Sequence, residues 1–292
     1  MQNKQTNFRK IPSAFILLPV IILALSVQGC AHQENTPVKV QTQAVTKAEQ
    51  QPVAQPENAT PPPAPIIQQY ALDRLKQMSE KLASAKAFTY HSNSFVELQA
   101  VTGQFITLFA DGEVALQRPN KMRANISGDV GNFQLYFDGA KVSAFDPQKN
   151  LRAVSGPLAT IDEMLDFVMD KAQMNFPSAD FLYSDPYAVM TKNLTHAIVV
   201  GDSMVNGVPC EHFAYMEPAI NWEIWIENGK NALPLRLAMT YKQVSNFPRF
   251  LVEFSDWNLN PKLKADTFVL KIPVNAKQIE FGTYRAEKKQ SK

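Results

Sequence analysis

The feature that most constrains the fold is a change of hydrophobic period after Lys86. Beyond this residue apolar and polar side chains alternate with a period of two, the spacing at which every second side chain shares one face of a β-strand. Turn residues such as Asp111-Gly112 and Gly128 separate the alternating stretches, and the short links between them favour antiparallel hairpins. The pattern therefore predicts a mainly β domain of about ten antiparallel strands. The predicted strands are 88–99, 104–110, 113–117, 121–127, 132–138, 194–200, 210–216, 222–227, 235–241 and 249–257, followed by a short apolar stretch at 269–272.

Two segments with helical spacing accompany the strands. Apolar residues recur every three or four positions through a stretch rich in Lys, Gln and Glu, which predicts an amphipathic helix over residues 66–86. A second helix is predicted to begin after Thr160, because Thr160 and Glu163 have the spacing of a capping box. The connection 175–191 that follows is long and aromatic, which is typical of a lid or a binding loop.

The first 29 residues have the features of an export signal. Lys4, Arg9 and Lys10 precede an apolar stretch of about 14 residues, too short for the roughly 20 residues of a membrane-spanning helix. This stretch ends in Val27-Gln28-Gly29-Cys30, which resembles the lipobox of bacterial lipoproteins. The resemblance implies cleavage before Cys30, lipidation of its thiol and stable attachment to a membrane through the acyl chains. By resemblance to enterobacterial sorting signals, Ala31 favours the outer membrane.

Composition separates the rest of the chain into a tether, one domain and a tail. Residues 30–65 are rich in Pro and Gln and, after Cys30, contain no aromatic residue, so they cannot bury enough apolar surface to fold and are expected to form a flexible tether. We expect one β domain over 66–284 and a polar tail over 285–292. Removal of 1–29 eliminates three basic and no acidic residues, and the near-neutral mature chain argues against nucleic-acid binding.

Several motifs resemble a bacterial family of predicted periplasmic proteins known as domain of unknown function 2092. These motifs are 118–123 (RPNKMR), 182–187 (LYSDPY), 205–212 (VNGVPCEH), 221–229 (NWEIWIENG) and 233–236 (LPLR). The family looks related to the periplasmic carriers LolA and LolB and to mycobacterial lipid-carrying lipoproteins. The resemblance implies a curved antiparallel half-barrel, closed by an N-terminal helix and a mid-chain plug helix, whereas the strand pattern alone is equally consistent with a closed barrel.

No motif predicts a catalytic site, a metal site or a cofactor. The histidines lack metal-ligand spacing, and no nucleophile elbow, zinc-protease or phosphate-loop motif is present. Cys210 and His212 lie two apart on one predicted strand, so they share a face, but simple packing on the sheet explains them better than a thiol–imidazole pair. We therefore expect a protein without enzymatic activity.

The candidate site is an apolar cavity between the concave face of the sheet and the plug helix. Apolar side chains repeat on single faces of several strands, and more of them are present than one core requires. The predicted lining residues are Phe105, Phe109, Phe133, Leu135, Phe137, Trp222, Ile224, Phe250 and Phe254 from strands, and Met164, Leu165 and Val168 from the plug helix. A filled core would use the same residues, so the sequence leaves the cavity itself open.

Two functions fit these patterns. The first is a lipid-anchored periplasmic protein that binds or carries an acyl chain or a lipidated molecule, with the mid-chain helix and 175–191 acting as a movable plug. The second is an envelope protein-interaction or stress-sensing module that binds no lipid.

Overall fold

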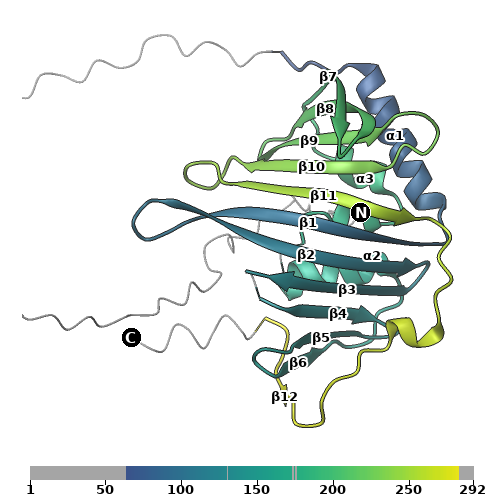
Figure 1. The fold of residues 1–292 in the computed structure, drawn as a ribbon, viewed down its shortest axis with the longest axis vertical. Helices are drawn as coiled ribbons and strands as arrows, with labels where there is room; N and C mark the ends of the chain where they lie inside the picture. Colours follow the sequence, from purple (N-terminus) through teal and green to yellow (C-terminus); the bar gives the residue numbers. More distant parts are fainter. Residues whose placement is uncertain (1–63, 130, 173, 175, 283–292) are drawn as a thin grey trace, which may run out of the picture. The chain divides into compact units, whose positions relative to one another are not determined.

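The structure, a computed structural model, describes residues 64–282 except 130, 173 and 175. Twelve strands form one open, curved sheet in the order β12-β6-β5-β4-β3-β2-β1-β11-β10-β9-β8-β7 (Figure 1). All neighbours are antiparallel except β12 and β6, which are parallel. The strands are β1 (Ala87–Gln99), β2 (Phe105–Gln117), β3 (Lys121–Gly128), β4 (Phe133–Phe137), β5 (Val142–Asp146), β6 (Leu151–Val154), β7 (His196–Val205), β8 (Val208–Met216), β9 (Ile220–Glu227), β10 (Pro234–Tyr241), β11 (Arg249–Asn258) and β12 (Lys277–Gln278).

The order of the strands follows from two meanders, β1 to β6 and β7 to β11, in which each strand pairs with the next along the chain. The pairing of β1 with β11 joins the meanders into one sheet. The mainly β fold with an antiparallel, curved sheet is therefore confirmed. The sheet remains open because its end strands, β7 and β12, pair with different neighbours and not with each other.

Helices cover one face of the sheet. They are α1 (Gln69–Ser84), α2 (Ile161–Asp166), the π-helical turn η2 (Phe167–Lys171), the 3-10 turn η3 (Ala179–Leu182) and α3 (Pro186–Thr191), while a further 3-10 turn, η4 (Ala265–Phe268), lies near the end of the domain. In Figure 1, α2 and α3 lie behind the sheet. The predicted helix start at Thr160 is confirmed, because the Thr160 hydroxyl accepts a hydrogen bond from the Glu163 backbone N–H at 3.1 Å.

The predicted strand boundaries were wrong in the first meander. Asp111-Gly112 is not a turn, since β2 runs through it unbroken and Gly112 pairs with Ser92. A Cβ at Gly112 would lie 2.5 Å from the Ser92 hydroxyl oxygen, so glycine leaves room for the Ser92 side chain here. Strands β5 and β6, of five and four residues, were missed.

Two predictions in the second half also need correction. The stretch 269–272 is not a strand, and the last strand is the two-residue β12. The connection 175–191 contains η3 and α3, so it is not a loop without regular structure. Asp185 caps α3 by accepting a hydrogen bond from the Ala188 N–H at 3.0 Å, and Pro186 occupies the first helical position, where its missing N–H costs nothing.

The predicted signal peptide 1–29, the lipid anchor Cys30, nearly all of the tether 30–65 and the tail 285–292 lie outside the described residues. Within the described part of the chain, no helix has both the length and the hydrophobicity needed to cross a membrane.

Candidate functional site

One continuous apolar layer lies between the sheet and residues 161–191, which we call the plug segment. Its four buried residues in α2 and η2 are Ile161, Met164, Leu165 and Val168, each at most 1% exposed. The second half of the plug adds Phe181, whose ring packs edge-on against Phe254 of β11 at a centroid distance of 5.4 Å. The plug segment and the sheet therefore share one core.

The sheet contributes side chains from several strands whose register places them on the same face. In the first meander, Ile126, Ala124 and Met122 of β3 lie opposite the predicted residues of β4. In the second, Met239 of β10 lies between Trp222 of β9 and Phe250 of β11. The predicted residues on this inner face are Phe133, Leu135, Phe137, Trp222, Ile224, Phe250 and Phe254, all buried except Phe133, which is partly buried.

The predicted position of Phe105 and Phe109 was wrong. Both lie on the opposite, outer face of the sheet and are 38% and 59% exposed. The register explains this result, because β2 pairs Leu116 with the buried Phe88 and keeps the same alternation along its whole length. Every even-numbered residue of β2 therefore faces inward, and the two phenylalanines face outward.

The described structure is closed at this site. The space beside Trp222 is a cavity of about 10 Å³, lined by Asp180, Met190, Ile220, Trp222, Leu237 and Met239. Binding pockets for small molecules typically measure roughly 300–1,000 Å³. A ligand therefore has to displace the plug segment or its side chains.

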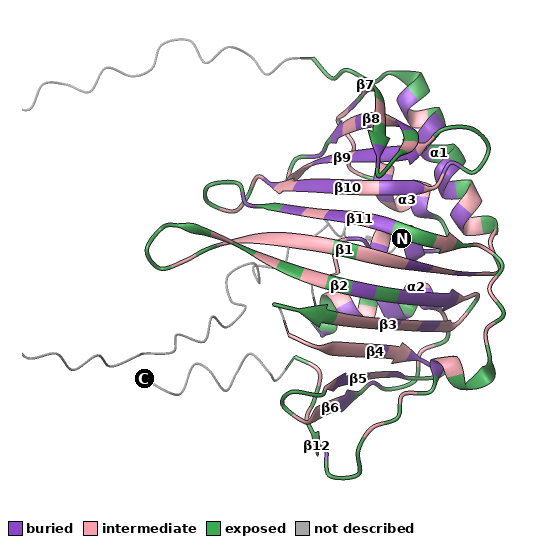
Figure 2. Ribbon diagram, viewed as in Figure 1, coloured by how far each residue is buried: buried purple, intermediate pink, exposed green. Residues whose placement is uncertain are grey.

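The polar contacts between the plug and the sheet concentrate at the turn between β2 and β3. The Arg118 guanidinium donates hydrogen bonds to the backbone oxygens of Leu182 at 3.2 Å and Tyr183 at 2.9 Å. Beside it, the Ile161 N–H donates to the Pro119 oxygen at 3.1 Å. The plug is thus attached by directional bonds at one edge. It rests on the remaining sheet mainly through apolar contacts, and β10 is buried along most of its length (Figure 2).

Hydrogen bonds within the plug hold its two halves together. The Tyr183 hydroxyl donates to Asp166 at 2.7 Å, and burial, reinforced by this carboxylate, raises the pKa of Tyr183 above its usual range. Asp162 accepts from both the N–H and the hydroxyl of Ser184. The α2–η2 helix and the following segment are therefore expected to move as one body.

The helix α1 is bound differently. Arg74 forms an ion pair with Glu211 of β8 at 2.6 Å and donates to the Glu227 oxygen at 2.9 Å, and its side chain is only 9% exposed. The Tyr215 hydroxyl donates to the Ala71 oxygen at 2.9 Å. These buried bonds reach both β8 and β9, so α1 is the fixed helix and the plug segment is the candidate for movement.

The other candidates from the sequence have structural roles. Cys210 is fully buried on the outer side of the sheet, and burial raises the pKa of its thiol, which disfavours a nucleophilic thiolate. The ring of His212 stacks on Trp225 at 3.9 Å and its Nε2 lies 3.0 Å from Glu223. Among the described residues, no group of three or more His, Cys, Asp or Glu side chains is placed to hold a metal ion.

Sequence reasoning missed Arg118, Phe181 and Met190. Arg118 is a single basic residue at a turn, and no local pattern shows that its partners lie more than 60 positions away. The other two were assigned to a loop, although Asp185 before Pro186 is a helix-start signal that would have identified α3.

Comparison with known proteins extends these observations. A family model described as "Predicted periplasmic protein (DUF2092)" matches residues 71–282. No curated protein matches the chain. The chain is similar to the solved structure of lipoprotein LppX from Mycobacterium tuberculosis, with 11% identity, coverage of 67% of this chain and 99% of that chain, and a TM-score of 0.42. A LolA superfamily protein from Nitrosomonas europaea has 11% identity, coverage of 68% and 97%, and a TM-score of 0.36.

Proposed function

The chain belongs to the family of predicted periplasmic proteins called DUF2092, and from this premise we propose that it is a membrane-anchored lipoprotein that binds or carries a lipophilic molecule. The ligand is an acyl chain or a lipidated molecule. It lies between the inner face of the sheet and the plug segment, and Cys30 carries the anchor that keeps the domain at the periplasmic side of the outer membrane. The protein acts without catalysing a reaction.

The observation that carries this proposal is the asymmetric attachment of the plug segment. Hydrogen bonds made by Arg118 and Pro119 hold one edge, and the large interface beyond them is mainly apolar. Apolar contacts are not directional, so an acyl chain can replace the plug's apolar side chains on the sheet.

The residues of this layer suit such an exchange. Met122, Met164, Met190 and Met239 are all buried in it, and they come from both the sheet and the plug. Methionine is unbranched and flexible, and it adapts to surfaces of different shape. The π-helical turn η2 within the plug is a further sign, because such turns are frequent at functional sites.

Photo-crosslinking tests the location of the ligand. The protein, extracted in detergent from membranes, is incubated with a fatty acid that carries a diazirine, irradiated and digested, and the labelled peptides are identified by mass spectrometry. We expect labels within 161–191 and on β9 to β11, and competition by unlabelled oleate. Labels confined to the outer face around Phe109 would reject the proposed site. Labelling that unlabelled oleate does not reduce would reject it as well.

A further inference from the structure

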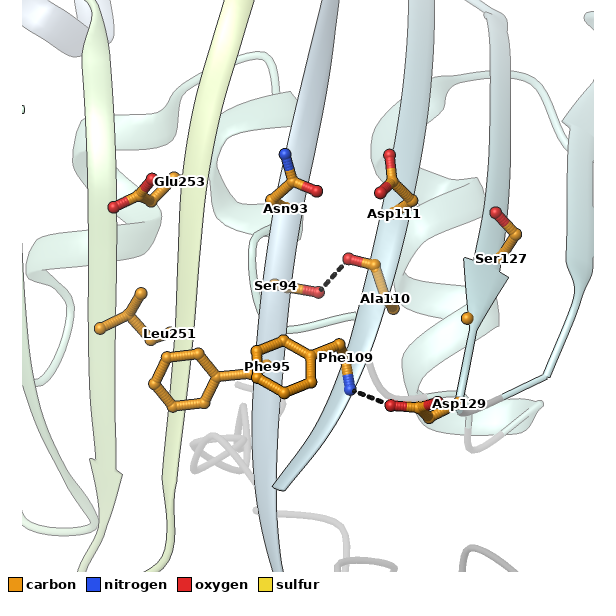
Figure 3. A pocket seen from close by; sticks show the side chains of 11 residues that line it. Asn93, Ser94, Phe95, Phe109, Ala110, Asp111, Ser127, Asp129, Leu251 and Glu253 are labelled. Carbon is orange, nitrogen blue, oxygen red and sulfur yellow. Dashed lines mark hydrogen bonds between the residues drawn. The ribbon is translucent and has the colours of Figure 1, made fainter. Parts of the chain in front are cut away.

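A groove of about 360 Å³ lies on the outer face of the sheet, away from the plug segment, where β11, β1, β2 and β3 run side by side (Figure 3). Its floor is a row of apolar side chains that follows the strand register, because Leu251 lies opposite Phe95 and Phe95 lies opposite Phe109. The two phenyl rings are 6.0 Å apart. Phe109 is 59% exposed, so the floor is open to solvent.

A polar row runs beside this floor. Glu253, Asn93, Asp111 and Ser127 follow one another across the four strands, and Asp129 lies next to Phe109 (Figure 3). The groove is therefore lined by three carboxylates and by no Lys or Arg. Arg236 pairs with Glu253 and His91 lies 2.5 Å from Asp111, so Asp129 and the exposed side of Asp111 give the groove its negative charge.

The groove also borders an unpaired strand edge. Strand β3 pairs with β2 only from Ala110 onward, so residues 105–109 of β2 have β1 on one side and, among the described residues, no strand on the other. The Phe109 N–H and oxygen point to this open side, where the N–H donates to the Asp129 carboxylate at 3.0 Å and the oxygen accepts from the Asp129 N–H at 2.9 Å. Main-chain groups alternate along a strand, so those of Thr107 point to the same side.

Gly128 produces this arrangement. A Cβ at this position would lie 2.3 Å from the Phe109 oxygen, and its φ of +150° is one that side chains disfavour. Glycine therefore lets β3 approach β2 closely and end there. As a result β2 extends past its neighbour, and an unpaired edge with high strand propensity is left beside an apolar floor.

We propose that this groove binds an extended, basic peptide segment of a partner protein, which adds to β2 as a further strand beside Thr107. Main-chain hydrogen bonds to an exposed sheet edge give such complexes their affinity, and alternate side chains give them specificity. One face of the peptide places an apolar residue over Phe95 and Phe109, and its Lys or Arg residues reach Asp111 and Asp129.

The negative charge of the groove favours a basic peptide over two other ligands, a second copy of the chain and an anionic lipid headgroup. A second copy of the chain would bring a groove with the same negative charge against the first, and an anionic lipid headgroup would meet the carboxylates of Asp111 and Asp129. The inference does not rest on the proposed lipid site, because the groove lies on the opposite face of the sheet from the plug segment.

Fluorescence anisotropy with a labelled synthetic peptide tests the inference. The probe is an extended hexapeptide that carries Lys, Phe and Lys at alternate positions, so that they share one face, and Thr between them. The control probe has Glu in place of Lys, and the protein is the full chain extracted in detergent. We expect the Lys probe to bind with an affinity that falls as salt rises, and the Glu probe not to bind. Equal binding of both probes would overturn the proposal.

Two variants and one control variant test whether the peptide binds in the groove. Asp111→Asn with Asp129→Asn removes two charges from the groove and should weaken binding at least tenfold, whereas Asp73→Asn with Glu80→Gln removes two charges from the exposed side of α1 and should leave it unchanged. Thr107→Pro removes an N–H from the open edge, a position that tolerates proline, and should abolish binding. Unchanged binding by the first pair or by Thr107→Pro would refute the groove.

Two further tests do not depend on whether the substituted variants fold: N-methylated peptide probes, and deletion of the C-terminal tail. A probe with N-methyl groups along one edge cannot add as a strand through that edge, so we expect at least one of the two edge-methylated probes to lose binding to the unaltered protein. Retention by both would contradict strand addition. Deletion of 283–292, which contains Arg285, Lys288 and Lys289, should not change the affinity; a tenfold gain would make the chain's own tail the occupant and overturn the assignment to a partner.

Discussion

Replacement of Arg118 by alanine should release the plug segment while the sheet remains folded. The Arg118 side chain supplies two charged hydrogen bonds to the backbone oxygens of Leu182 and Tyr183, both buried residues. Such a bond contributes about 1.5–3 kcal/mol, and the losses overlap because both bonds share one guanidinium, so we expect opening of the plug to become easier by about 2–4 kcal/mol.

Hydrogen–deuterium exchange measured by mass spectrometry detects this change. Since 1.4 kcal/mol corresponds to a factor of ten, the amides of 176–191 should exchange about 30- to 700-fold faster in the variant. Amides of β8 to β10 should keep their wild-type rates, because local opening does not require global unfolding. The exchange rate of these amides in Arg118→Lys should lie between those of the wild type and Arg118→Ala, since an ammonium lacks the planar guanidinium geometry that bonds two carbonyls at once.

Arg123→Ala is the matched control. Arg123 follows in the next strand and pairs with Glu113 on the outer face at 3.4 Å, where the carboxylate is largely exposed. Exposed pairs contribute about 0–1 kcal/mol, so exchange in the plug should stay unchanged. If exchange in the Arg118→Ala variant became faster by the same factor in the plug and in the sheet, the two would unfold as one unit. The plug segment would then not open separately from the sheet.

Three further predictions follow from the described residues and the predicted signal peptide. Phe137→Ala, at a fully buried site, should lower the free energy of unfolding by about 3–5 kcal/mol in urea titrations, whereas Phe109→Ala should change it by less than about 0.5 kcal/mol. Burial lowers the pKa of the His212 imidazole, against the opposing effect of Glu223, so the unfolded chain takes up a proton first as the pH falls. Wild-type stability should therefore drop from pH 7 to pH 5 more steeply than that of His212→Gln, and parallel curves would contradict this. Cys30→Ser should move the protein from the membrane to the periplasmic fraction, and continued membrane association would refute the anchor.

The faces of the strands could be predicted where the alternation is strong. Phe133, Leu135 and Phe137 share the inner face because the period of two is a property of the extended chain itself. The faces of Phe105 and Phe109 could not be assigned, because they depend on whether Asp111-Gly112 breaks the strand. That outcome is decided by the pairing of Gly112 with Ser92, which lies 20 residues earlier in the chain.

The residues of the apolar layer were predictable only in part, and its packing was not predictable. Met164, Leu165 and Val168 are buried in the layer against the sheet, in a helix that begins at the Thr160 cap. A filled core and a binding cavity use the same apolar side chains, so only the packing of the plug decides between them. The role of Arg118 could not be predicted, because its hydrogen-bond partners are backbone oxygens and every residue has one.

Native mass spectrometry with lipid extraction tests the central claim most directly. The protein is extracted from membranes, alongside the Cys30→Ser form purified from the periplasm so that the anchor's own acyl chains are not counted. We predict one non-covalent lipid or acyl chain per protein in both preparations, released when the protein unfolds. An empty Cys30→Ser protein that also fails to take up a fluorescent fatty acid would contradict the carrier function.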